Sequence, residues 1–452
     1  MENIAAKKNI KLPALLTAAS LFFILLYAPV FNNEISNRAL ALLVFVAVLW
    51  MTEAIPLALT ALSIPAIAIL LGLLPPANAF SQFANPVIFL FMGGFVLAGA
   101  LSAQSLDKLL AQKLIGLAKG NFYRSSILLM LTTSLLACWI SNTSSAAMMI
   151  PLALGLLRLA NQKDMARESK FLMLGIAYSA NIGGVITMIA SPPNAIGAAI
   201  LGMSFSEWMA YGLPIFLITF PTMIMILTLY FRPDRKLTIE KLIIKDLKTP
   251  YRKRLVIIFF LTVFLWMSDG LLSPLLNITS GFSSLVAIFS ILLLFIFKVM
   301  EWDDILSSIK WDILLLFGGG LTLGVLVESS GLGAILIAGV MEFGKEIPLF
   351  LFLWLIVLFS IALTEFMSNT ASAALILPLL YTLAVQSNIN PMILVLPATI
   401  ATSYGFMLPV GTPPNAMVFS TGFIPQTEMM KVGFAINIIF SIILTLFFYL
   451  LF

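Results

Sequence analysis

Long, nearly uninterrupted apolar runs are the feature of this sequence that most limits its possible folds. Hydrophobic residues make up 61% of the 452 residues and charged residues only 10%. A water-soluble globule could not bury so much apolar surface. Because a helix of about 20 residues crosses a bilayer, the sequence predicts an all-α polytopic membrane protein. Such runs are Leu12 to Phe31, Ala39 to Met51, Val256 to Met267 and Gly433 to Phe452. The third run predicts one helix over about residues 255–276.

The placement of basic residues predicts which ends face the cytoplasm. Of the 25 Lys and Arg residues, 21 lie at or before Arg254, and nine of them fall in Arg232 to Arg254. Under the positive-inside rule this loop and the start with Lys7, Lys8 and Lys11 face the cytoplasm. The basic balance is therefore topogenic, and we expect no nucleic-acid partner. The first apolar run has no small-residue cleavage signature after it, so we expect a retained helix and not a signal peptide.

Two segments are predicted to enter the membrane and return to the same side. Residues 125–159 have basic flanks at both ends, and their arms around residues 141–143 are shorter than the about 20 residues of a crossing. The second segment surrounds residues 368–370, and its flanks, which include Lys345 and Glu346, lack basic clusters. We expect the first hairpin to enter from the cytoplasm and the second from outside. Together with about eleven crossings, this gives a cytoplasmic N-terminus and an extracytoplasmic C-terminus.

Four landmarks recur in the same order in the two halves of the chain. Leu49 to Glu53 resembles Leu265 to Asp269, Gly93-Gly94 matches Gly319-Gly320, SPPN from Ser191 matches TPPN from Thr412, and the segments SNTSSAAMMIP and SNTASAALILP agree at seven of eleven positions. An odd number of crossings precedes the second copy, so the repeats are predicted to be inverted, as in many secondary transporters. The predicted divisions are an N-terminal segment with the first helix (1–37), a first repeat (38–231), the basic loop (232–254) and a second repeat (255–452).

Paired prolines are predicted to break a helix in each half. Each proline removes a backbone donor and clashes with the preceding turn. A break leaves carbonyl groups without partners and starts a new helix N-terminus. The predicted breaks lie at Pro192, Pro193, Pro413 and Pro414, and the freed carbonyls include those of Ala190 and Gly411.

The two Ser-Asn-Thr triplets each precede a helix-forming run and are predicted to cap a half-helix. Free N–H groups and the positive end of the helix dipole would make each tip an anion site without any lysine or arginine. Two such tips facing each other suit a small anion with a carboxylate at each end. The asparagine side chains and freed carbonyls are also candidate ligands for a monovalent cation.

Enzyme chemistry is not expected. The chain has no histidine and a single cysteine, Cys138, which excludes Ser–His and Cys–His pairs and an intramolecular disulfide. No lysine lies within either hairpin tip or proline break, which argues against a Ser–Lys protease. We expect no cofactor, and no metal beyond a possible sodium ion.

These paired motifs resemble those of the divalent anion:sodium symporter family, whose members carry dicarboxylates or citrate or exchange 2-oxoglutarate for malate or succinate. The resemblance implies an elevator-type transporter that works as a homodimer. From the apolar composition and the expected absence of a cleavable leader, we expect it in a bacterial inner membrane, with an organelle membrane as the alternative. It assigns substrate contacts to Ser141, Asn142, Thr143, Ser191, Ser368, Asn369, Thr370 and Thr412. It assigns cation ligands to Ser141, Asn142, Ala190, Thr364, Ser368, Asn369 and Gly411.

One departure from the family pattern bears on coupling. The hydroxyl one turn before the triplet is present as Thr364 in the second half, but the first half has Ala137. Loss of one oxygen should weaken a cation site, so dicarboxylate exchange is slightly favoured over sodium symport, which stays open as the alternative. A cation–proton antiporter fits less well, because it needs acidic ligands in both broken helices. Glu365, beside Thr364, is either a functional or a structural carboxylate.

Overall fold

The regular secondary structure that the computed structural model describes is helical. Described are residues 11–28, 30–106, 109, 110, 113, 116–160, 165–239, 249–278, 280–335 and 347–452, so the predicted topogenic or flanking residues Lys7, Lys8, Lys345, Glu346 and 240–248 lie outside this part. The helices with described bounds are α1 (Leu12–Tyr27), α2 (Glu34–Thr52), α3 (Leu57–Leu70), α4 (Pro76–Ser81), the 3-10 helix η1 (Gln82–Ala84), α5 (Pro86–Ala103), α7 (Phe122–Ala137), α8 (Asn142–Leu159), α9 (Ala166–Gly183), α10 (Pro192–Leu201), α11 (Phe205–Phe231), α12 (Arg252–Met267), α13 (Asp269–Leu275), α14 (Phe282–Ile296), α15 (Trp302–Ser308), α16 (Trp311–Ser329), α18 (Leu349–Phe366), α19 (Asn369–Gln386), α20 (Pro391–Ala401), α21 (Pro413–Ser420) and α22 (Gln426–Leu451).

Within the described residues, seven helical segments are long and apolar enough to cross a membrane, in agreement with a polytopic membrane protein. Five further apolar helices are shorter, and the eleven crossings stay a prediction. The expectation of one helix over residues 255–276 is wrong, because α12 and α13 meet at a 74° bend. At the bend Asp269 turns into the protein, where Ser283 Oγ donates to its carboxylate at 2.8 Å.

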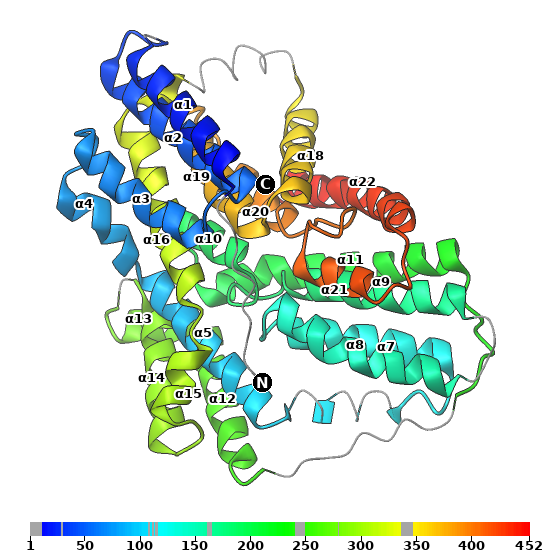
Figure 1. Cartoon of the computed structure of the whole chain (residues 1–452). Helices are drawn as coiled ribbons and strands as arrows, with labels where there is room; N and C mark the ends of the chain where they lie inside the picture. The colour runs from blue at the N-terminus through cyan, green and yellow to red at the C-terminus, as the bar shows by residue number, and fades with distance from the viewer. Residues whose placement is uncertain are drawn as a thin grey trace.

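The start of α7 and the start of α9, which lie on either side of the first predicted hairpin, contact the same loop. The N–H of Phe122, at the start of α7, donates to Leu237 O at 2.9 Å. The N–H of Asp234 donates to Glu168 Oε1, in the first turn of α9, at 2.9 Å. The chain therefore leaves this loop along α7 and returns to it along α8, which lies beside α7 (Figure 1). This geometry supports a re-entrant hairpin with its tip at residues 141–143.

Glycine contacts are repeated between the two halves. A Cβ added to Gly93 of α5 would lie 2.6 Å from Ala287 Cβ of α14, and a Cβ on Gly319 of α16 would lie 2.5 Å from Ala61 Cβ of α3. Only glycine allows these two helix pairs to approach so closely. The same contact pattern recurs elsewhere: α7 packs on α9 as α18 packs on α20, and α8 packs on α21 as α19 packs on α10.

The helices form two groups (Figure 1). We call α1–α5 with α12–α16 the scaffold group, and α7–α11 with α18–α22 the hairpin group. The broadest contact between the groups joins α16 to α19, where a Cβ on Gly320 would lie 2.9 Å from Ala374 Cβ. The matching pair in the other half, α5 and α8, is instead separated by a cavity of about 200 Å³. The hairpin group is therefore packed on the scaffold at one hairpin and parted from it at the other.

Candidate functional site

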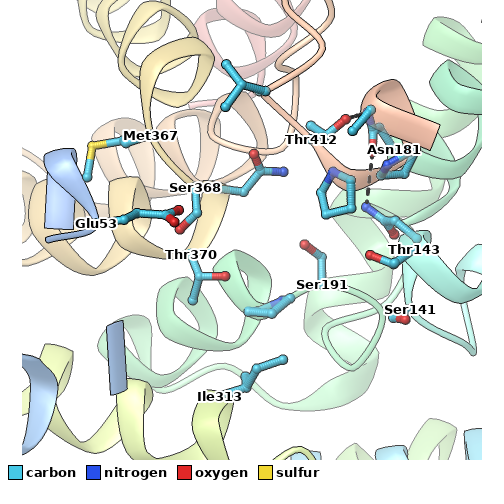
Figure 2. A pocket seen from close by; sticks show the side chains of 18 of the residues that line it. Glu53, Ser141, Thr143, Asn181, Ser191, Ile313, Met367, Ser368, Thr370 and Thr412 are labelled. Carbon is cyan, nitrogen blue, oxygen red and sulfur yellow. Dashed lines mark hydrogen bonds between the residues drawn. The ribbon is translucent and has the colours of Figure 1, made fainter. Parts of the chain in front are cut away.

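One cavity of about 620 Å³ is lined by both triplets and by both helix breaks. Figure 2 shows Ser141 and Thr143 on one side, Ser368 and Thr370 on the other, and Thr412 between them. The two tips are thus brought to one site from opposite halves of the sequence. The lining includes the eight residues predicted to contact substrate, namely Ser141, Asn142, Thr143, Ser191, Ser368, Asn369, Thr370 and Thr412.

Each triplet begins a helix with its serine as the N-cap. Ser141 Oγ accepts the N–H of Ser144 at 3.3 Å, and Ser368 Oγ accepts the N–H of Ala371 at 3.2 Å. The helices α8 and α19 that follow are each 18 residues long. Their N-termini therefore present the remaining free N–H groups and a positive dipole end to the cavity.

The two helix breaks lie just before the paired prolines. Residues 184–191 and 402–412 are not helical, and the prolines form the first turns of α10 and α21. In the first break, Asn194 Nδ2 donates to Gly184 O at 2.7 Å and to Thr187 O at 2.8 Å. One side-chain amide thus satisfies two carbonyls that the break frees. Pro192, Pro413 and Pro414 line the cavity, whereas Pro193 is buried outside its lining.

The second break is held in the same way. Asn415 Nδ2 donates to Gly405 O at 2.9 Å and to Leu408 O at 3.1 Å. The last asparagine of SPPN and of TPPN is therefore a clamp across the break. The sequence showed these asparagines only as the last residues of the matched SPPN and TPPN motifs.

The predicted cation ligands fall in two places. Ala190 and Gly411 line the cavity, whereas Thr364 is fully buried behind the second tip. Thr364 Oγ1 lies 2.7 Å from Asn369 Oδ1 and 2.8 Å from Thr402 O. Three neutral oxygens converge there, a ligand set that suits sodium.

The first half differs at the matching place. The side chain of Ala137 carries no oxygen, and Asn142 Oδ1 is buried without a hydrogen-bond partner in the described part of the chain. Asn142 Oδ1 packs against Gly184, where an added Cβ would lie only 2.2 Å away. The first tip therefore has an unused acceptor but one fewer oxygen than the second.

Asn181 is a site residue that sequence analysis missed. It lies on α9, is fully buried, and donates from Nδ2 to Thr412 Oγ1 at 3.1 Å. Asn142 Nδ2 lies 3.5 Å from Asn181 Oδ1, at the limit of a hydrogen bond. Asn181 thereby joins the first triplet to the second break. A buried polar residue in the mostly apolar second part of α9 was the available signal.

The expectation of an anion site without lysine or arginine is wrong. Lys310, directly before α16, lines the cavity, and its Nζ donates to Ser141 Oγ at 3.0 Å. The same contact removes the premise that argued against a Ser–Lys pair. Lys11 also lines the cavity, and its Nζ donates to Thr52 O at 2.8 Å. Both lysines belong to the scaffold group, so the neighbourhood of the triplets in the sequence could not reveal them.

Glu365 is bound by the second break. Its Oε1 accepts the N–H of Met407 at 2.8 Å and Asn437 Nδ2 at 2.7 Å. Its Oε2 accepts the N–H of Leu408 at 3.0 Å. These contacts favour the structural reading of this carboxylate, because its accepting atoms hold the unwound backbone in place.

Comparisons with known proteins point to transport. The family model described as citrate transporter matches residues 47–399. An uncharacterized transporter of Haemophilus influenzae is 43% identical over 432 residues, which cover 94% of this chain and 93% of that protein. The sodium-dependent dicarboxylate transporter SdcS of Staphylococcus saprophyticus is 34% identical over 464 residues, which cover 95% of this chain and 88% of that protein.

A solved structure shares the fold. The YdaH transporter of Alcanivorax borkumensis aligns with a TM-score of 0.54 at 14% identity, over 82% of this chain and 86% of that chain. At this identity the likeness concerns the fold alone. The family model and these relatives are transporters and point to a transport function.

Proposed function

This chain belongs to the divalent anion:sodium symporter family, as the citrate transporter match and the dicarboxylate transporter relatives show, and we propose that it carries C4 and C5 dicarboxylates across the cell membrane. Succinate, malate, fumarate and 2-oxoglutarate are the expected substrates. The observation that carries this proposal is the meeting of both triplets and both helix breaks at one cavity.

Each carboxylate of the substrate is proposed to bind at one helix N-terminus. The tips supply free N–H groups, and the hydroxyl and amide groups of the triplets add further donors. Ser141 to Thr143 hold one carboxylate and Ser368 to Thr370 the other. Thr412 and Ser191 contribute from the helix breaks between them.

The transport step is proposed to be a displacement of the hairpin group along the scaffold group. The uneven packing supports this, since α19 lies on α16 while a cavity parts α8 from α5. Movement to the opposite arrangement would bring α8 onto α5 and separate α19 from α16, as inverted repeats allow. An elevator-like shift within a homodimer is the form that we propose.

Exchange of one dicarboxylate for another is proposed as the transport mode, with sodium symport as the alternative. Ala137 removes one oxygen from the first cation position, and Lys310 places a fixed positive charge at the same tip. The oxygens of Thr364, Asn369 and Thr402 favour the alternative, because they retain a sodium-type site in the second half. The name of the SdcS relative also favours it.

Labelled succinate uptake into proteoliposomes tests the transport mode. Stimulation by internal dicarboxylate without a sodium gradient means exchange, and stimulation by sodium alone means symport. No saturable succinate uptake under either condition would overturn the proposed function.

Two asparagine variants test the assigned site. Asn142→Ala and Asn369→Ala should each abolish dicarboxylate flux in folded protein. Asn390→Ala is the matched control, because Asn390 likewise lies at the start of a helix, α20, but is exposed and lies outside the cavity. Full transport by either of the first two variants would refute the assigned contacts.

A further inference from the structure

Lys310 joins the two helix groups at the substrate cavity. It directly precedes α16 of the scaffold group, and its Nζ hydrogen-bonds to Ser141 Oγ at the tip of the hairpin group. If the hairpin group moves along the scaffold during transport, the lysine does not move with it. The contact therefore belongs to one conformation of the carrier.

The ammonium group of Lys310 has N–H donors that Ser141 does not use. Lysine carries three N–H donors, and Ser141 Oγ accepts one of them. Within the described residues, no carboxylate lies in ion-pair distance of Lys310, and the Phe95 ring centre lies 5.8 Å from Nζ. A partly buried cation without a carboxylate partner is suited to receive an anion.

While Lys310 is hydrogen-bonded to Ser141 Oγ, the hydroxyl group of Ser141 has little hydrogen-bonding capacity left for an anion. Its Oγ accepts from Lys310 and from the N–H of Ser144, and it lies 2.9 Å from Ser144 Oγ, to which its proton can be donated. The free N–H groups of Lys310 lie at the same tip. They are the charged donors nearest to the first triplet in the described structure.

We propose that Lys310 binds a carboxylate of the substrate in this conformation only, and so gives the carrier a higher affinity on one face of the membrane than on the other. This inference rests on the proposed function. On the topology predicted from the basic flanks, the first hairpin opens to the cytoplasm, so the higher affinity belongs to the cytoplasmic face. Lys310 is a substrate-contacting residue supplied by the part of the protein that stays in place.

The position of the first repeat that matches Lys310 carries no charge. Asn85 directly precedes α5 as Lys310 directly precedes α16. When the second hairpin is the open one, the matching position of the repeat therefore presents an uncharged amide. The two faces thus differ by one charged hydrogen bond to the substrate. Loss of such a bond is expected to weaken binding roughly 10-fold or more.

The test measures the half-saturation concentration of succinate separately on each face, in vesicles of uniform orientation. Lys310→Met should raise the cytoplasmic value roughly 10-fold or more and leave the other face unchanged. Lys310→Arg should retain most of the cytoplasmic affinity. Lys431→Met, which removes an exposed lysine outside the cavity, is the matched control.

The pH dependence of the cytoplasmic half-saturation concentration is a second test, because a lysine that only packed against its neighbours would not produce one. Burial lowers the pKa of Lys310 from its usual value, and Asp312 partly offsets this shift. Lys11 and Glu53 also line the cavity. As pH rises, the ammonium loses its proton, so the cytoplasmic half-saturation concentration of the wild type should rise. The corresponding curve for Lys310→Met should rise less over the same range.

The outcomes separate this inference from the proposed function. Wild-type protein that transports no dicarboxylate refutes the function, and the inference with it. If the wild type transports but Lys310→Met changes both faces equally, or neither, the inference alone is refuted. A Lys310→Met variant that fails to fold leaves the decision to Lys310→Arg, and a fall in affinity on both faces in that variant overturns the inference.

Discussion

Removal of the Glu365 carboxylate should destabilise the second helix break. In Glu365→Ala, the N–H groups of Met407 and Leu408 and the amide of Asn437 lose their acceptor. A buried donor left without a partner costs about 1–3 kcal/mol, so three donors amount to roughly 3–9 kcal/mol. Met407 and Leu408 are partly exposed and can reach water after a small movement. We therefore expect the lower end, about 3 kcal/mol.

Glu365→Gln separates hydrogen bonding from charge. A glutamine oxygen still accepts at one of the two positions, but its NH₂ group then faces a donor. The loss should be about 1–3 kcal/mol, well below that of the alanine variant. Cys138→Ala is the matched control, because Cys138 occupies the same place before the first triplet and its thiol makes one weak contact, to Leu135 O at 3.0 Å.

Reversible unfolding in mixed micelles gives the free energy of unfolding for the three variants, and succinate flux with and without sodium gives their activity. Glu365→Ala should be much less stable than the wild type, and Cys138→Ala close to it. The structural role is refuted if Glu365→Ala is as stable as the wild type. A Glu365→Gln variant that is stable but has lost its response to sodium would instead assign an ionic role to the carboxylate.

Three further variants test the packing and the site. Gly319→Ala should destabilise the protein by about 1–3 kcal/mol in thermal unfolding assays, because its Cβ would meet Ala61, whereas Gly270→Ala, with nothing within 4 Å, should be close to neutral. Asn415→Ala should leave the carbonyls of Gly405 and Leu408 without their donor. Both the free energy of unfolding, measured in unfolding assays, and the dicarboxylate flux, measured in uptake assays, should therefore fall. Ala137→Ser should restore a hydroxyl beside the first tip and increase the stimulation of uptake by sodium, and an unchanged sodium response would argue against the proposed loss of that cation site.

Local rules account for what the sequence predicted well. A serine before a helix-forming run acts as an N-cap through atoms three residues away, and a proline acts on its own turn. Ser141, Ser368 and the two breaks could therefore be placed without a fold. The triplets could be expected at one site because the landmarks recur in order. The contact of Asn181 with Thr412, 231 positions away, has no such local signature.

The bend at Ser268 shows a second kind of feature that the sequence alone could not predict. Nothing in the apolar run before it marks an end, and a continuous helix over residues 255–276 was the natural expectation. The helix changes direction where the Asp269 carboxylate reaches Ser283 Oγ on α14. Whether an acidic residue near the end of a span bends the helix or faces solvent depends on a partner that only the fold supplies.

Lys310 shows that two similar inverted repeats can form a substrate site that is not symmetric. Only four Lys or Arg residues follow Arg254, and the positive-inside rule treats a lysine before a helix as a topogenic charge. In a carrier of anions, the same position at the end of a scaffold helix also lies at the substrate cavity. Two identical repeats would bind the substrate equally on both faces of the membrane. Here the residues before α5 and α16 differ by one charge, so the proposed sidedness depends on a residue that neither triplet contains.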